Sequence, residues 1–325
     1  MKFPGFHILI ILLATGLITS ACSRHEYKFE EGIAWNTAYH ITYESDRNLS
    51  DSIIYVLNEI DNSLSPFNRE STVTKINENR SSETDSHFNK VYAESVRINA
   101  ATDGAFDPTL APLIRAWGFG QGHMISPNDT LRLDSLLELV GISKTEIINK
   151  KIAKKNPGIE FNFSALAKGY GVDCIADMLI RNGVVNFLVE IGGEIRANGH
   201  NPGGNKWGIG IDRPIEDSKG EIVETIYLNS GAVATSGNYR NFHKDGERQF
   251  GHTISPKTGR PIQTDVISAT VIAPDCMEAD AIATSCMVLG AEKALNLCNK
   301  LNLAVMIIKN DLTVESNSAF DRLLK

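Results

Sequence analysis

Apolar and polar positions alternate strictly in the stretch IAWNTAYHITY, residues 33 to 43. Alternate side chains of an extended chain point to the same side, so Ile33, Trp35, Ile41 and Tyr43 share one face. The pattern therefore predicts a single β-strand over these eleven residues.

Apolar residues at helical spacing predict helices elsewhere along the chain. The first begins at about Ser50 and ends before Pro66, and others end at Gly104 and Gly183. A further helix begins with Ser126 as N-cap and Pro127 in its first turn. The predicted helices cover residues 50–65, 86–104, 126–141 and 164–183, with two more near 278–301.

Short β-branched and apolar runs predict that the second half of the chain is mainly strand. These runs cover residues 184–191, 207–212, 222–228, 231–235, 266–273 and, as the final strand, 303–309. Helices gather in the first half without regular strand-helix alternation, which favours an α+β fold over a doubly wound parallel sheet. No repeat or long linker divides the chain after residue 33.

The composition is that of a globular protein, with 325 residues of which 42% are hydrophobic and 22% charged. The 39 acidic residues outnumber the 32 basic ones, giving a net charge of -7. No Lys/Arg stripe is available to neutralise a phosphate backbone, so the sequence does not favour nucleic acid as a partner.

The N-terminus has the features of an export signal. Lys2 precedes the apolar run HILIILLATGLI, and small residues in TSAC lead to Cys22. This pattern resembles a bacterial lipoprotein signal, in which the cysteine is lipidated and becomes the new N-terminus. We expect a signal peptide over 1–21, a polar tether over 22–32 and an exported lipoprotein anchored in a membrane and facing the periplasm. The alternatives are a plain secretory signal or an uncleaved membrane anchor.

Four stretches place small residues at the end of a helix or strand, where a ligand can approach the backbone. They are TDGAFDPT (102–109), FNFSALAKGY (161–170), EIGGEIRANG (190–199) and ATSGNYRNF (234–242). In the first, we expect Ala105 to Asp107 to be extended and exposed to a ligand. Each stretch alone also fits a cap, a bulge or a turn without a ligand.

A fifth stretch, EADAIATS (278–285), places Asp280 and Thr284 four residues apart on one helix face. Both offer oxygen to a hard cation such as Mg²⁺, which keeps several waters and completes its shell with substrate phosphates. In the alternative interpretation, Thr284 bonds back to its own helix and Asp280 faces solvent.

The stretch HTISPKTGRP, residues 252 to 261, predicts a tight turn directly after a histidine. Together with LSPFNRESTVTKIN (64–77), the five stretches and this turn resemble, in order, motifs of the ApbE family, the FAD:protein FMN transferases. The resemblance runs from about residue 33 to the C-terminus. It implies one ApbE-like domain over 33–325 with mixed or antiparallel sheets and packed helices.

The resemblance also implies a site. Mg²⁺ is held by the backbone carbonyl of Ala165 and the side chains of Asp280 and Thr284, and it bridges the FAD pyrophosphate. His252 is the catalytic candidate, as general base or as a positioning group, and Asp107 or Asp280 could share the role. The flavin and phosphate contacts match Trp35, Phe67, Ala105, Phe106, Asp107, Asn162, Lys168 and Ile254.

Three positions depart from the family pattern. Trp35, Asn36 and Thr37 stand where Met-Gly-Thr is usual, Phe67 stands where Tyr is frequent, and Asn162 stands where Asp is common. These changes alter the flavin edge and remove a charge near the nucleotide. They bear on the balance between FMN transfer and FAD hydrolysis.

The function implied is Mg²⁺-dependent transfer of FMN from FAD to a Thr or Ser hydroxyl of a target flavoprotein, releasing AMP. The expected acceptor carries a D-G-x-[ST]-G-[AST]-T type motif, as in flavin subunits of the sodium-pumping NADH:quinone reductase and Rnf complexes. The alternatives are an FAD pyrophosphatase that gives FMN and AMP, and a flavin-binding lipoprotein without chemistry.

Overall fold

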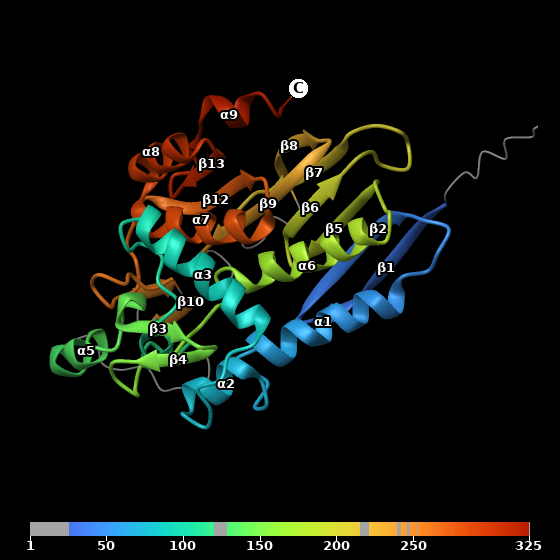
Figure 1. The fold of residues 1–325 in the computed structure, drawn as a ribbon. Helices are drawn as coiled ribbons and strands as arrows, with labels where there is room; N and C mark the ends of the chain where they lie inside the picture. Colours follow the sequence, from blue (N-terminus) through green and yellow to red (C-terminus); the bar gives the residue numbers. More distant parts are fainter. Residues whose placement is uncertain are drawn as a thin grey trace, which may run out of the picture.

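An eight-stranded antiparallel sheet forms the centre of the protein in a computed structural model (Figure 1). The structure describes residues 26–119, 129–214, 221–238, 242–245, 248–251 and 253–324. In spatial order the strands are β1 (Tyr27–Ala34), β2 (Thr37–Glu44), β5 (Phe187–Ile191), β6 (Glu194–Asn198), β9 (Ser230–Gly237), β12 (Val266–Ala273), β13 (Ala304–Lys309) and β14 (Val314–Ser316). Neighbouring strands pair antiparallel throughout this sheet, which confirms the α+β class.

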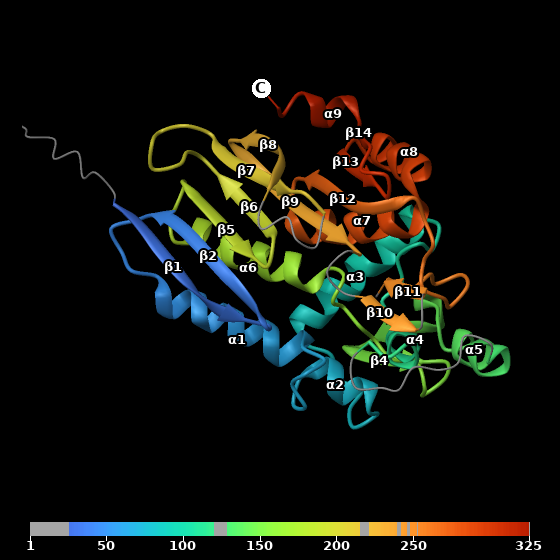
Figure 2. The same cartoon turned by 180° about the vertical axis from the view of Figure 1, so that it is seen from behind.

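Helices cover one face of the sheet, and a hairpin covers part of the other (Figures 1 and 2). The covering helices are α1 (Ser50–Leu64), α3 (Ser86–Ala101), α6 (Ala167–Arg181), α7 (Cys276–Leu289) and α8 (Ala291–Leu301). Helix α7 packs against α6, β9 and β12, so its residues are buried nearly all round. On the opposite face, β7 (Trp207–Asp212), β8 (Ile222–Leu228) and α9 (Ser318–Asp321) bury a separate apolar cluster.

The predicted strand over residues 33 to 43 is wrong in one respect, because the chain reverses within it. Residues Trp35 and Asn36 have φ values of 52° and 62°, and they join β1 to β2 in a hairpin. Positive φ at both central residues is the geometry of a two-residue hairpin turn. Residues 27 to 32, which we expected in a tether, form most of β1.

The remaining elements gather at one end of the sheet (Figure 2). They are α2 (Thr72–Asn77), α4 (Ala111–Ala116), α5 (Thr130–Leu137), the 3₁₀ turn Ile142–Lys144, and the hairpins β3–β4 (Thr145–Ile148, Lys151–Lys154) and β10–β11 (Phe242–Asp245, Arg248–Gly251). Helix α5 begins at Thr130, with the Asp129 side chain accepting from Arg132 N–H. The predicted cap, Ser126, and Pro127 lie outside the described residues. The predicted final strand is followed by β14 and α9.

The predicted signal peptide and the lipidation site Cys22 also lie outside the described residues. Within the part of the chain that is described, no helix is both long enough and apolar enough to cross a bilayer.

Candidate functional site

A cavity of about 580 Å³ lies where the start of α6, the end of β9 and the loop after α3 meet. Eleven predicted site residues line it: Trp35, Phe67, Ala105, Phe106, Asp107, Asn162, Ala165, Lys168, Ile254, Asp280 and Thr284. They come from segments spread over most of the chain, and only the fold brings them together. His252 lies outside the described residues, but Thr253 and Ile254, which follow it, also line the cavity.

Asp280 is a buried carboxylate at this cavity, with an exposed fraction of 4%. Its Oδ2 accepts a hydrogen bond of 3.1 Å from the backbone N–H of Gly169 in α6. Burial raises the pKa of Asp280, while Lys168 and the Gly169 N–H act in the opposite direction. The alternative in which Asp280 faces solvent is therefore wrong.

The carbonyl of Ala165 is left without its helical partner. In a regular helix the N–H of Gly169 would bond to the carbonyl four residues earlier, which is that of Ala165. Because Gly169 donates to Asp280 instead, the Ala165 carbonyl has no hydrogen-bond donor among the residues the structure describes. Ala165 and Asp280 both line the cavity, and each has an oxygen acceptor without a hydrogen-bond donor in the described part of the chain.

Thr284 does not bond back to its own helix. Its hydroxyl lies 3.0 Å from the hydroxyl of Ser236 on β9. The next residue, Ser285, makes the bond within the helix, donating to the Ala281 carbonyl at 2.7 Å. The second half of the alternative interpretation is therefore also wrong, and Thr284 is one of the residues that line the cavity.

Lys168, the second residue of α6, pairs with Glu194 on β6. Burial alone would lower the pKa of Lys168, but the carboxylates of Glu194 and Asp280 raise it above its ordinary value. Burial raises the pKa of Glu194 to about 8, against the lowering effect of Lys168. Lys168 and Glu194 line the cavity together with Asp280, so one basic and two acidic residues lie at its surface.

Glu194 is the main site residue that the sequence analysis missed. It follows the two glycines of EIGGEIRANG, a stretch singled out only for its backbone. The signal available in the sequence is a charged residue directly after two glycines, at the start of a strand. The structure buries this residue to 3% exposure. Buried acidic side chains are rare unless they are paired, which makes this position informative.

Asp107 also lines the cavity, but its carboxylate is occupied by hydrogen bonds. It accepts from the backbone and hydroxyl of Thr109, from Ile142 N–H at 3.0 Å and from Asn99 Nδ2 at 3.3 Å. Residues 105 to 107 are buried from solvent, and all three line the cavity, where a ligand could reach them. Asp107 thus holds this loop in place.

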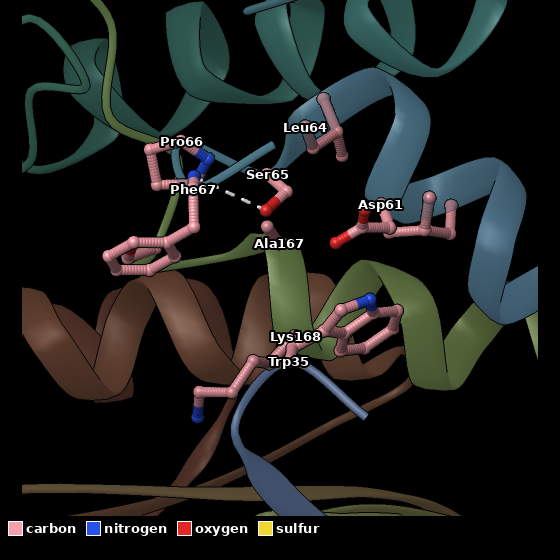
Figure 3. Close-up of a pocket in the computed structure, with 10 residues that line it drawn as sticks. Trp35, Asp61, Leu64, Ser65, Pro66, Phe67, Ala167 and Lys168 are labelled. Carbon is pink, nitrogen blue, oxygen red and sulfur yellow. Dashed lines mark hydrogen bonds between the residues drawn. The ribbon is translucent and has the colours of Figure 1, made fainter. Parts of the chain in front are cut away.

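Two aromatic residues also line the cavity. The Trp35 ring lies across α6 at Gly171, where an added Cβ would come within 2.2 Å of it. Phe67 is 70% exposed in the loop after α1. A smaller cavity of about 170 Å³ adjoins the first and shares Trp35, Phe67, Ser164 and Lys168 with it (Figure 3). Flat apolar rings in the same cavity as the Lys168 ammonium suit a ligand with both an aromatic and an anionic part.

The turn after His252 is built rigidly, as the sequence predicts. Ser255 N–H donates to Arg260 O at 2.9 Å, and Gly259 N–H donates to Ser255 O at 2.8 Å. The indole N–H of Trp117 donates to Gly259 O at 2.7 Å from the buried end of α4. Ile254 is buried in the same cluster, so the segment that leads away from His252 is fixed against the cavity wall.

The chain belongs to the ApbE family. The family's sequence profile matches residues 35 to 307. The chain is 35% identical to the FAD:protein FMN transferase of Haemophilus influenzae, over 97% of this chain and 96% of that protein. It is 36% identical to the enzyme of the same name from Vibrio cholerae, over 93% and 94% of the two chains.

Solved structures give the same result. The flavin transferase ApbE from Vibrio cholerae superposes with a TM-score of 0.83 and 34% sequence identity, covering 92% of this chain and all of that one. The apo flavinyl transferase ApbE of Pseudomonas stutzeri superposes with the same TM-score at 29% identity, covering 92% and 97% of the two chains. The predicted family and fold are confirmed.

Proposed function

We propose that this protein transfers FMN from FAD to a Thr or Ser hydroxyl of a target flavoprotein and releases AMP, with Mg²⁺ as its metal. The observation that carries the proposal is the cavity itself. Asp280, Thr284 and Ala165 present oxygen donors beside Lys168, with Trp35 close by. Relatives that span nearly the whole chain carry the name FAD:protein FMN transferase.

The three oxygen donors fit a magnesium ion. Mg²⁺ prefers hard oxygen ligands and uses few protein ligands where a substrate supplies phosphates. Such a set is provided by the Ala165 carbonyl, which has no donor in the described part of the chain, by the second oxygen of the Asp280 carboxylate and by the Thr284 hydroxyl. When bound there, the ion would neutralise charge on the pyrophosphate oxygens of FAD.

The chain's own residues have separate tasks in this proposal. The Lys168 ammonium binds a phosphate oxygen, and Glu194 holds the ammonium in place. The rings of Trp35 and Phe67 offer stacking faces to the flavin or adenine ring. The proposed role of Asp107 is to hold its loop in position and not to transfer a proton, because its carboxylate already accepts four hydrogen bonds.

His252 is proposed as the group that takes the proton of the acceptor hydroxyl. An imidazole has a near-neutral ordinary pKa, and general base catalysis contributes about 10²- to 10⁴-fold. The fixed turn at residues 253 to 262 supports this proposal, since it keeps the neighbouring backbone at the cavity. The oxygen of the acceptor then attacks the FMN phosphorus, and the bond to the AMP phosphate breaks.

The proposed setting is a lipoprotein anchored through Cys22 and exported to the periplasmic side. The acceptors proposed are flavin subunits of the sodium-pumping NADH:quinone reductase or Rnf type, carrying the D-G-x-[ST]-G-[AST]-T motif. If water replaces the acceptor hydroxyl, the same site becomes an FAD pyrophosphatase.

Intact-mass spectrometry of an acceptor domain tests the proposal. The full-length chain in detergent is incubated with the domain, FAD and Mg²⁺, with an EDTA control and an AMP assay. A Mg²⁺-dependent gain of one FMN, with one AMP released, is the expected result. AMP without modified acceptor indicates hydrolysis instead, and bound FAD without either product indicates a carrier.

Two substitutions assign the roles. Asp280→Ala is expected to abolish Mg²⁺-dependent turnover, and an unchanged rate would remove the metal from this position. His252→Ala is expected to leave FAD binding largely intact while turnover collapses. If FAD affinity fell as far as the rate, His252 would be a binding residue rather than the base.

A further inference from the structure

We propose that Ser236 is a positioning residue for the cation site, because it accepts the proton of the Thr284 hydroxyl and so directs the Thr284 oxygen towards the ion. The inference rests on the proposed Mg²⁺ site and adds a residue to it. Ser236 lies near the end of β9, the strand against which α7 packs.

The geometry joins these two hydroxyls closely. Their oxygens are 3.0 Å apart, and both side chains line the large cavity. No other hydrogen-bond partner of either hydroxyl is found in the described part of the chain. The strand register also holds Ser236 in place, opposite Ala269 of β12.

The direction of the hydrogen bond follows from the chemistry of a hydroxyl. A threonine hydroxyl has one proton and two lone pairs. A cation takes a lone pair and repels the proton, so the Thr284 proton must point away from the ion. Ser236 Oγ is the acceptor in hydrogen-bond range. The Ser236 proton is then available for an acceptor in the cavity, such as an anionic phosphate oxygen.

The Asp280 side chain is also oriented by a hydrogen bond from another element, helix α6. The Gly169 N–H of α6 binds its Oδ2 and leaves its Oδ1 for a ligand. Each side-chain ligand is thus oriented from outside α7, one by α6 and one by β9. Groups that orient metal ligands typically change metal affinity by about 10- to 100-fold when they are removed.

The experiment measures Mn²⁺ binding by electron paramagnetic resonance, with Mn²⁺ as the probe for the site. The full-length chain in detergent is titrated without FAD, so no turnover is required. Ser236→Ala is expected to raise the Kd for Mn²⁺ about 10-fold or more. Ser236→Thr restores a hydroxyl and is expected to recover most of the affinity.

Two further variants separate orientation from general damage. Ser285→Ala removes the neighbouring buried hydroxyl, which among the described residues bonds only within α7, and is expected to leave the Kd unchanged. Ser236→Cys keeps the side-chain size but offers a poor acceptor, so it is expected to weaken binding even if Ser236→Ala fails to fold. Wild-type affinity in both Ser236→Ala and Ser236→Cys, or an equal loss in Ser285→Ala, would overturn the inference.

The inference and the proposed function fail in different ways. If Asp280→Ala binds Mn²⁺ as well as the wild type does, the cation is not at Asp280 and Thr284, and the role of Ser236 falls with it. If Mn²⁺ binding follows the expected pattern but no acceptor gains FMN, the transferase proposal fails while Ser236 keeps its role.

Discussion

Helices α6 and α7 approach each other so closely at Gly169 that a single methyl group should disturb both the fold and the site. A Cβ at this position would lie 2.3 Å from the carbonyl oxygen of Cys276, about 0.7 Å inside the 3.0 Å limit of real contacts. The obstacle is backbone, so Gly169→Ala must push the two helices apart. The Gly169 N–H bond to Asp280 would then stretch from 3.1 Å to roughly 3.8 Å, beyond hydrogen-bond range.

Two costs and one gain set the size of the effect. Overpacking costs about 1–3 kcal/mol, and the lost bond to a carboxylate costs about 1.5–3 kcal/mol. Replacing a helical glycine by alanine returns about 1 kcal/mol. We expect a net destabilisation of about 1.5–5 kcal/mol. For a domain of this size that lowers Tm by several degrees.

Gly171→Ala is the matched control, in the same helix with the same gain in helix propensity. Its Cβ meets the far end of the Trp35 ring at 2.2 Å, and a side chain can move aside. We expect stability within about 1 kcal/mol of wild type and an FAD affinity several-fold weaker, because the ring leaves the cavity wall.

Thermal unfolding and FAD titration of the two variants provide the measurements. Gly169→Ala should unfold at a clearly lower temperature than Gly171→Ala. A Gly169→Ala protein as stable as the wild type, or more stable, would refute the reasoning, since the helix-propensity gain would then act without any clash.

Three other predictions concern buried polar groups. Glu194→Gln should cost roughly 1–3 kcal/mol, because the Lys168 ammonium loses one of its two acidic neighbours, and adding Lys168→Met should recover part of it; additive costs in urea unfolding would contradict the pairing. Burial raises the pKa of Asp173 to about 6 against its hydrogen bonds from Cys276 and Met277. Between about pH 4 and 6 the folded protein therefore holds a proton on Asp173 that the unfolded chain has lost, so the contribution of Asp173 to stability falls as pH rises through this window. Asp173→Asn should lack that slope, so its Tm relative to the wild type should rise from pH 4 to pH 7 and then stay level. Trp117→Phe leaves the buried carbonyl of Gly259 without its donor and should cost about 1–3 kcal/mol, with faster hydrogen exchange at residues 253 to 262.

The sequence predicts the long helices well, because their signals are local. The apolar stripe from Ser50 and the stop at Pro66 match α1, and Gly183 follows the end of α6. The first strand was predicted wrongly for the same local reason. Alternation continues through Trp35 and Asn36, and the side-chain period does not reveal that both residues take positive φ and reverse the chain.

The sequence likewise predicts some features of the site and leaves others open. Motif order alone indicates the family and names Asp280, Thr284 and Lys168, because these residues sit in stretches that the family shares. The sequence also yields two interpretations of Thr284, as a ligand or as a residue bonded to its own helix. Helical spacing is identical in both cases and does not separate them.

Only the tertiary structure decides which polar groups meet. The sheet order β6-β9-β12, with α6 and α7 packed beside it, brings Glu194 to Lys168 and Ser236 to Thr284. These partners are distant in sequence, and no periodicity links them. The sequence determined the helices, the family and the candidate ligands because those depend on local pattern. The tertiary structure decided how the ligands are oriented and paired, because that depends on long-range packing.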